Sequence, residues 1–438
     1  MNKKSSSIVG DIPMKLVNEF THELSLPLTH IINSIFETKK YPEVWKKEVI
    51  TPIPKIYPAS RIKDLRPISG LHTFAKAFDR IIAEYMTDDM SEKRDPHQYG
   101  NEKGLSVNHY LINLVHKILT GVDQNSNKNK QAAILTMIDY AQAFERQSHK
   151  LGVQSFVKNG VRKSLIPVLI SFFEERKIMI KWKTNFSKQV TVSGGGAQGG
   201  TAGGILEYLS QTAGNLNFLE NDEGFKFIDD SSMVEILNLV LGGLSSYNVR
   251  QQVPSDIGTN CHFLSKENFQ TQTYLNKIKE WTDSHQMKLN SEKTKYMITN
   301  FCSSAQFQVR LQINENVLEQ VHETKLLGVI LTEDHKWNSN TENLVKRAYK
   351  RMMILRNLTN FNVPDDDLIN IYKLYIRSIV EQSCVVWASS ITEEDKQALE
   401  RVQKIALRII YLKRYISYNH ALAVSGLESL SKRRDELC

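Results

Sequence analysis

The chain has 438 residues, of which 41% are hydrophobic and 24% charged, with a formal net charge of +8 and a pI near 9.0. This length exceeds one typical core and predicts two or three packed subdomains. Four widely spaced cysteines with no CxxC pair argue against a disulfide scaffold and a zinc knuckle. Because neither a secretory signal nor a membrane-length apolar run is visible, we expect an intracellular protein of the cytoplasm and/or nucleus with no membrane partner.

The first third of the chain mixes helical and strand patterns. Residues 14–40 have the apolar spacing of one or two amphipathic helices, which end at Tyr41-Pro42. The β-branched segment VITPIP (49–54) predicts a strand, and the basic residues 63–67 predict a turn. Helical spacing returns over 71–86.

The middle of the chain predicts a strand and a hairpin that both carry carboxylates. After the polar run 123–130, the apolar segment AAILTMID predicts a buried strand that ends at Asp139. Helical patterns follow through Phe156 and over 165–173, before a glycine cluster at 194–204. The segment FKFIDDSSMVEI then has the pattern of a hairpin with Asp229 and Asp230 at its polar centre.

The remainder changes from mixed α/β to all-helical patterns near Trp337. Residues 250–272 predict a polar surface insertion. The other expected elements are a helix at 273–286, strands at 294–299 and 326–331, and helices centred on 341–359, 366–388 and 393–411. The fold class is therefore α/β with an all-α C-terminal region.

One carboxylate at the end of a buried strand and a pair at a hairpin tip suit two-metal nucleotidyl transfer. Mg²⁺ prefers carboxylate oxygens, and two ions about 3.5–4 Å apart can activate a hydroxyl and stabilise a leaving pyrophosphate. Asp139, Asp229 and Asp230 supply such a set. Each of these residues taken singly also fits a purely structural role, because Asp is common at turns and helix N-caps.

Residues 41–438 resemble the reverse transcriptases of non-LTR (LINE or jockey-like) retrotransposons, motif after motif in the family order. The motifs that carry the resemblance are WKKEVITPIPK with LRPISGLHTFAKAFDRII, HQYGNEKGLSVNHYL, IDYAQAFERQSHKL, GGGAQGG, FKFIDD, WTDSHQMKLNSEKTKYMI, KLLGVILTEDHKW, and LINIYKLYIRSIVEQSCVVW with LERVQKIALRII. The resemblance implies a right-hand polymerase, in which fingers and a palm with an antiparallel sheet precede an all-α thumb. Its implied domains are an N-terminal helical extension (1–44), fingers (45–132), a palm with a finger insertion and the polar loop 250–272 (133–335), and a thumb with the C-terminal region (336–438).

The same resemblance implies a role for each matching residue. Asp139, Asp229 and Asp230 would be the catalytic metal ligands for two Mg²⁺, with Mn²⁺ as a possible substitute. The implied nucleotide-binding residues are Lys55, Arg66, Phe144, Gln198, Gly199 and Lys293. The expected partners are an RNA template, a DNA primer and dNTP.

The C-terminal quarter has the charge for a nucleic-acid surface. From Lys336 onward there are 17 Lys and Arg against 12 Asp and Glu. On one predicted helix Lys346, Arg347, Lys350 and Arg351 recur turn after turn, as expected of a thumb that follows the nucleic-acid backbone, although a solvated helix face has the same pattern.

Some positions depart from the family pattern. Ala197 stands where the GxPQG loop has proline, and the glycines after it also fit a flexible loop. Two alternatives to an active RNA-directed DNA polymerase therefore stay open: a catalytically inactive retroelement remnant that binds RNA, and an RNA-binding maturase-like factor.

Overall fold

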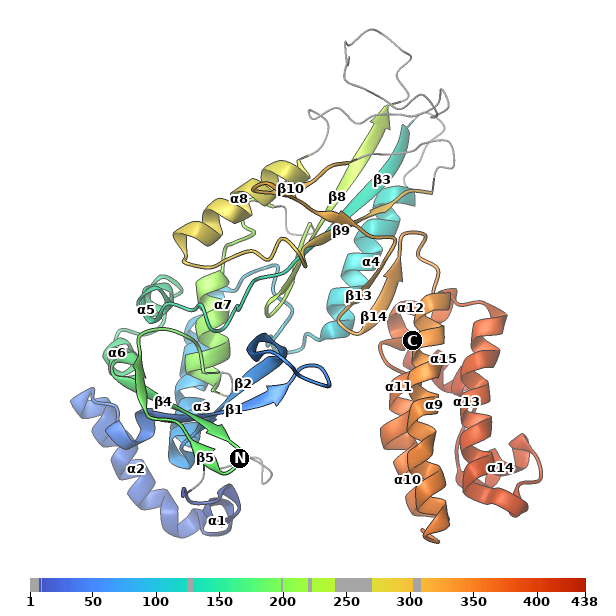
Figure 1. Ribbon diagram of the computed structural model, residues 1–438, viewed down its shortest axis with the longest axis horizontal. Helices are drawn as coiled ribbons and strands as arrows, with labels where there is room; N and C mark the ends of the chain where they lie inside the picture. Colours follow the sequence, from blue (N-terminus) through green and yellow to red (C-terminus); the bar gives the residue numbers. More distant parts are fainter. Residues whose placement is uncertain are drawn as a thin grey trace. The chain divides into compact units, whose positions relative to one another are not determined.

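The computed structural model describes residues 8, 10–123, 129–197, 200–219, 223–240, 270–301 and 309–438 (Figure 1). Its internal contacts divide the chain into two compact units. The first unit comprises Met1–Asn101, Ile138–Ser231 and Thr273–Lys293. The second comprises Glu102–Met137, Ser232–Gln272 and Thr294–Cys438.

A five-stranded sheet forms the centre of the first unit. Its order is β2-β1-β4-β5, with β6 paired to β4. Strand β1 (Lys47–Pro54) runs antiparallel to β2 (Leu65–Leu71) and parallel to β4 (Arg176–Trp182). The turn predicted at 63–67 was therefore wrong in part, because the main chain from Leu65 onward pairs along β1. The short strands are β5 (Asn185–Phe186) and β6 (Val190–Val192).

The helices of the first unit enclose an aromatic core beside this sheet. The predicted helices are confirmed as α1 (Met14–Glu19), α2 (Thr21–Thr38), α3 (Thr73–Asp89), α5 (His149–Lys158) and α6 (Ile166–Phe173), and α7 (Glu207–Thr212) is a further helix that the sequence analysis did not predict. The Tyr41 ring lies 5.0 Å from Phe172 and 5.8 Å from Phe78. Burial of such rings supplies much of the apolar free energy that holds helices on a sheet.

A second five-stranded sheet has the order β12-β9-β3-β8-β7. The strands are β3 (Asn129–Ile138), β7 (Gly224–Phe227), β8 (Asp230–Val240), β9 (Lys295–Thr299) and β12 (Glu319–Gln320). Strand β3 pairs antiparallel with β9, and its residues Ala132 to Leu135 are buried as predicted. Helix α4 (Val107–Asp123) packs on β8, where a Cβ at Gly121 would lie 2.3 Å from Ile236 Cδ1.

Two elements in the remainder differ from prediction. The strand predicted at 326–331 is a hairpin of β13 (Glu323–Leu326) and β14 (Val329–Thr332), because Leu327 and Gly328 take left-handed φ angles of 46° and 94°. The helix predicted at 366–388 is interrupted, and Ser383 has φ 49° between its last two segments. The polar insertion predicted at 250–272 lies, except for its last three residues, outside the described residues.

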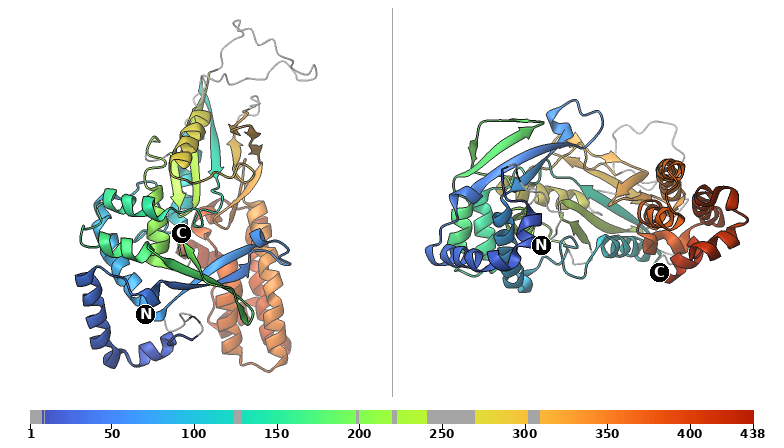
Figure 2. Two further views of the ribbon diagram at one scale, coloured as in Figure 1. Left: turned by 60° about the vertical axis from the view of Figure 1, so that its left-hand side comes forward. Right: turned by 90° about the horizontal axis from the view of Figure 1, so that it is seen from below.

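The C-terminal helices pack on one another within the second unit (Figures 1 and 2). They are α9 (Asn338–Asn360), α10 (Asp365–Ile371), a π-helical segment (Tyr372–Arg377), α11 (Ser378–Val380), α12 (Cys384–Trp387), α13 (Glu393–Tyr411), α14 (Tyr418–Ser425) and α15 (Leu430–Leu437). Trp387 and Tyr372 are fully buried between them. The mixed α/β class with an antiparallel sheet and an all-α C-terminal region is thus confirmed.

In the described part of the chain, no helix combines the length and the apolar character needed to cross a lipid bilayer.

Candidate active site

Asp139 lies directly after β3 and is held by a segment from far along the chain. Its backbone oxygen accepts from Asn290 N at 2.8 Å, and its Oδ2 accepts from Asn290 Nδ2 at 2.9 Å. Lys293 Nζ is 4.0 Å from the same Oδ2. Ala141 N donates to Lys288 O at 2.8 Å, so the segment 288–293 follows the main chain beside Asp139. The structure therefore brings the predicted Lys293 to Asp139.

Asp229 and Asp230 lie at the hairpin that joins β7 to β8. Ile228 occupies the turn with a φ of 60°, a left-handed conformation that is rare for a β-branched residue. Asp229 follows it, and Asp230 begins β8. The predicted hairpin is therefore present, with its two carboxylates at the turn.

The three carboxylates interact electrostatically. Burial and then the charge of Asp139 raise the pKa of Asp229, while Arg66 acts in the opposite direction. Burial, followed by the charges of Asp229 and Asp139, raises the pKa of Asp230 to about 6. Like charges disfavour one another's ionised form at short range. Among the described residues, however, no group of three or more His, Cys, Asp or Glu side chains is arranged to hold a metal ion.

Phe144 stacks on a tyrosine that the sequence reasoning missed. Its ring lies 5.0 Å from that of Tyr208 at an interplanar angle of 29°. Tyr208 is buried on α7, and its hydroxyl has no hydrogen-bond partner among the described atoms. Burial raises the pKa of Tyr208 well above its usual value, and the charges of the three carboxylates add to the shift. Tyr208 thus supports the Phe144 ring, and no local sequence signal singles it out.

The two basic residues predicted in the fingers occupy the β1–β2 hairpin. Arg66 pairs with Ile53 across the hairpin and is exposed, and its charge acts on Asp229. Lys55 is exposed just beyond β1, where its backbone N donates to Asp64 O at 2.7 Å. The predicted nucleotide contacts Gln198 and Gly199 lie outside the described residues.

Several described glycines of the 194–204 cluster are closely packed, which argues against the alternative of a flexible loop. A Cβ at Gly196 would lie 1.6 Å from Gln147 Oε1, and one at Gly204 would lie 2.3 Å from Ala197 O. The buried Asp79 of α3 accepts from Thr201 N at 2.6 Å at the start of the helical segment that leads into α7. Gly196 and Gly204 are therefore needed because a side chain would overlap neighbouring atoms, not because the main chain requires extra conformational freedom.

Replacing Gly196 with Ala is expected to destabilise the first unit and reduce activity, because the new methyl group overlaps the buried Gln147 amide. Overpacking of this kind costs about 1–3 kcal/mol. Urea denaturation measures the loss. The matched control is the same substitution in a Gln147→Ala background, which lacks the amide that the new methyl group overlaps. An equal loss of stability in both backgrounds would contradict the steric explanation.

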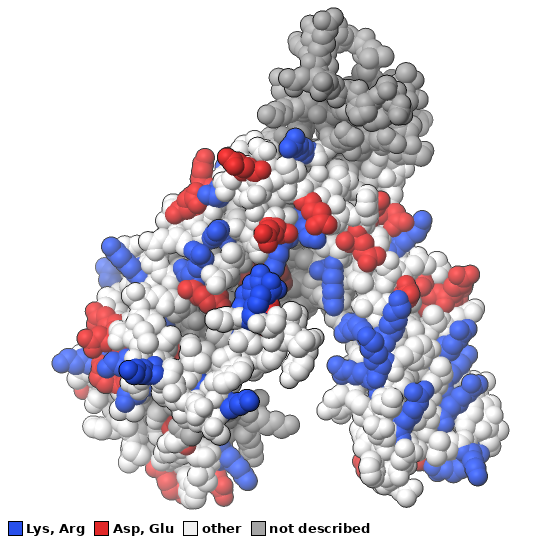
Figure 3. Space-filling view, viewed as in Figure 1, with Lys and Arg blue, Asp and Glu red and all other residues white. Residues whose placement is uncertain are grey.

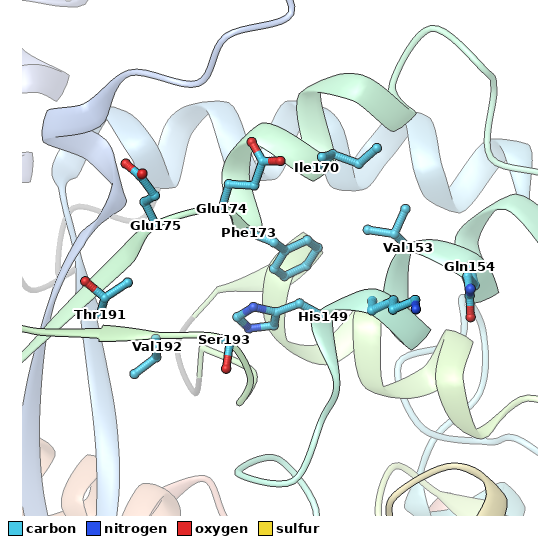
Figure 4. A pocket seen from close by; sticks show the side chains of 11 residues that line it. His149, Val153, Gln154, Ile170, Phe173, Glu174, Glu175, Thr191, Val192 and Ser193 are labelled. Atoms are coloured by element: carbon cyan, nitrogen blue, oxygen red, sulfur yellow. The ribbon is translucent and has the colours of Figure 1, made fainter.

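A cavity of about 540 Å³ opens beside this loop, between α5, α6 and β6 (Figure 4). Its wall includes His149, whose ring stacks on Phe173 at 4.6 Å and whose Nε2 lies 3.1 Å from Gly195 O. Burial lowers the pKa of His149 to about 4, so its imidazole is neutral near pH 7. This neutral ring supports the glycine loop from the side of the cavity.

The basic residues predicted on the thumb lie on α9 in two different environments. Lys346, Lys350 and Arg351 are exposed, although Lys346 Nζ is 2.6 Å from Glu342 Oε1. Arg347 is half-buried and donates to Gln382 Oε1 at 2.9 Å. Figure 3 shows Lys and Arg gathered over the C-terminal helices on the face in view.

Comparisons with known proteins found no matching family model. The chain is 26% identical over 338 residues to a probable RNA-directed DNA polymerase from transposon BS of Drosophila melanogaster, covering 76% of this chain and 35% of that protein. It is 22% identical over 398 residues to a probable RNA-directed DNA polymerase from transposon X-element of the same species, covering 88% of this chain and 40% of that protein. A solved structure of apo telomerase from Candida tropicalis is 11% identical, with a TM-score of 0.44, over 89% of this chain and 67% of that one.

The chain thus spans 35–40% of the length of these two curated relatives. The resemblance to non-LTR retrotransposon reverse transcriptases that the motifs predicted is confirmed by their similarity over most of this chain.

Proposed function

We propose that this chain carries the nucleotidyl-transfer centre of an RNA-directed DNA polymerase of a non-LTR retrotransposon. The strongest support is that the charge of Asp139 acts on Asp229 and Asp230, which belong to a separate motif of the chain. The substrates would be an RNA template, a DNA primer and dNTP. The proposed division is fingers at 45–132, palm at 133–335 and thumb at 336–438.

Asp139, Asp229 and Asp230 would hold two Mg²⁺ ions, for which Mn²⁺ could substitute. Their donor atoms are the hard oxygens that Mg²⁺ prefers, and burial together with neighbouring carboxylate charge raises the pKa values of Asp229 and Asp230. When bound, divalent cations would supply charge stabilisation for the attacking and leaving oxygens. The protein contributes the placement of the three carboxylates.

The surrounding residues fit the remaining steps of phosphoryl transfer. The primer 3′-oxygen attacks the α-phosphorus of the dNTP while the bond to pyrophosphate breaks. Arg66 and Lys55 would neutralise the triphosphate, and Lys293, held near Asp139, would give a proton to the departing pyrophosphate. Phe144, supported by Tyr208, would lie under the sugar and exclude a 2′-hydroxyl.

Other contacts follow the resemblance. Gln198 and Gly199 would contact the nascent base pair. On α9 the exposed Lys346, Lys350 and Arg351 would contact the phosphate backbone without reading sequence, and Arg347, which donates to Gln382, would orient that surface.

The test is incorporation of dTTP on a poly(rA)/oligo(dT) template with Mg²⁺ or Mn²⁺. We expect the primer to be extended in proportion to time and protein. Absence of extension with either ion, from protein shown to be folded by circular dichroism, would contradict the proposal.

The Mg²⁺ requirement is expected to rise as the pH falls through about 6. Asp230, whose pKa lies near 6 in the metal-free fold, binds a proton below that pH and then competes poorly for a cation. Because folding raises this pKa, the contribution of Asp230 to the stability of the metal-free protein is lost as pH rises from about 4 to about 6. Mg²⁺ titrations of incorporation at several pH values measure the effect. A half-maximal concentration that stays constant from about pH 5.5 to about 7.5 would contradict it.

A further inference from the structure

The segment 97–100 of the HQYG motif lies along β7 and pairs with it through one isolated β-bridge. Lys226 N donates to His97 O at 2.7 Å, and Tyr99 N donates to Lys226 O at 2.8 Å. The pairing of Gln98 with Lys226 is parallel. A segment about 130 residues upstream of the hairpin therefore covers the outer edge of β7.

The Gln98 side chain extends this contact to the turn itself. Its Oε1 accepts from Gly100 N at 2.8 Å and from Ile228 N at 2.9 Å. Gln98 is buried, with 5% of its surface exposed. Ile228 is the residue with a left-handed φ of 60°, and Asp229 follows it directly. One side-chain oxygen thus holds the backbone of a strained turn that presents the catalytic pair.

The residues packed around the Ile228 turn restrict its conformation. A Cβ at Gly100 would lie 2.7 Å from Ile228 N, so a larger residue would displace the turn. Lys226 is fully buried, with its Nζ 2.6 Å from Asp95 Oδ2 and 2.9 Å from Thr212 O. At the start of β7, His97 Nδ1 lies 3.2 Å from Gly224 O, so both ends of β7 contact the segment 95–100.

We propose that Gln98 is a positioning residue for nucleotidyl transfer: it fixes the Ile228 turn so that Asp229 and Asp230 face Asp139. The proposal rests on the proposed function. Gln98 does not touch substrate in this role; it acts through the main chain of the turn. Misplacement of a catalytic group by about 1 Å can cost on the order of 100-fold in rate.

The experiment compares Gln98→Met, which keeps the length and removes the acceptor, with Gln98→Glu, which keeps an acceptor oxygen. For Gln98→Met we expect kcat to fall by about tenfold or more and the half-maximal Mg²⁺ concentration to rise, with KM for dTTP little changed. Gln98→Glu should lie nearer to the parent. Gly100→Ala adds a methyl group that would displace the Ile228 turn without replacing Gln98. This variant should show the same lower kcat and higher half-maximal Mg²⁺ concentration as Gln98→Met.

The matched control is Gln403→Met in α13. Gln403 is equally buried and its amide bonds Tyr372, Tyr418 and Glu428 O, so its loss should lower thermal stability without altering the Mg²⁺ requirement. If Gln98→Met keeps the parent's kcat and Mg²⁺ requirement, the proposal is overturned. It is equally overturned if Gln98→Met behaves like Gln403→Met.

Hydrogen exchange separates this proposal from the proposed function. In the metal-free protein, the amides of residues 98–100 and 226–230 should exchange faster in Gln98→Met than in the parent, and direct Mn²⁺ binding should weaken. If the parent extends no primer, the proposed function fails, while these two measurements still test Gln98. Unchanged exchange and unchanged Mn²⁺ binding would then overturn the positioning role.

Discussion

Replacing Asp229 with Asn is expected to lower primer extension by at least about 10³-fold, the scale on which a catalytic unit loses rate when one member is removed. The substitution keeps the shape of the side chain and removes one of the charges that would hold the metal ions. It also removes repulsion, because the charge of Asp139 raises the pKa of Asp229 in the metal-free fold. The variant should therefore unfold at the same or a higher temperature than the parent.

This combination of lost activity and retained stability is what separates a metal ligand from a structural residue. Primer extension on poly(rA)/oligo(dT) measures the activity, and thermal unfolding without metal measures the stability. Asp283→Asn serves as the control, since Asp283 is 61% exposed and pairs only with Lys279 one turn away among the contacts described. Equal incorporation by the parent and Asp229→Asn would contradict the assignment.

Replacing Arg176 with Leu is expected to destabilise the first unit by about 3–5 kcal/mol, the usual cost of leaving a buried charge unpaired. Arg176 on β4 and Glu48 on β1 form an ion pair in which each side chain is 3% exposed. Arg176 also donates to Gly195 O at 3.2 Å. Its loss would leave the Glu48 carboxylate without a counter-charge between two paired strands. Urea denaturation of the variant measures the change.

Two further variants test the explanation. In Arg80→Leu the lost partner is Glu84, and both side chains of this pair are more than half exposed, so the change should stay within about 1 kcal/mol. The double variant Glu48→Leu/Arg176→Leu should recover part of the stability lost by Arg176→Leu, because no charge remains buried. A single variant as stable as the parent would show that the pair contributes nothing.

The elements that carry the carboxylates could be predicted from local patterns. A continuous apolar run predicts a buried strand wherever it falls, and β3 ends at Ile138, directly before Asp139, close to the end that this run indicated. The hairpin of Asp229 and Asp230 was visible because apolar residues flank a short polar centre. The break in the strand at Leu327 and the break in the helix at Ser383 each depend on a left-handed φ angle. The periodicity of the apolar residues did not reveal these breaks.

The amino-acid sequence by itself determined the fold class and the order of the motifs and singled out three acidic residues as candidates, because each depends on residues adjacent in the chain. Only the tertiary structure decided what holds those residues. Gln98 and Ile228 are 130 positions apart, and Asn290 and Asp139 are 151 apart. Such contacts depend on how strands and helices pack, and a single chain's residue pattern carries no record of which distant side chains that packing brings together.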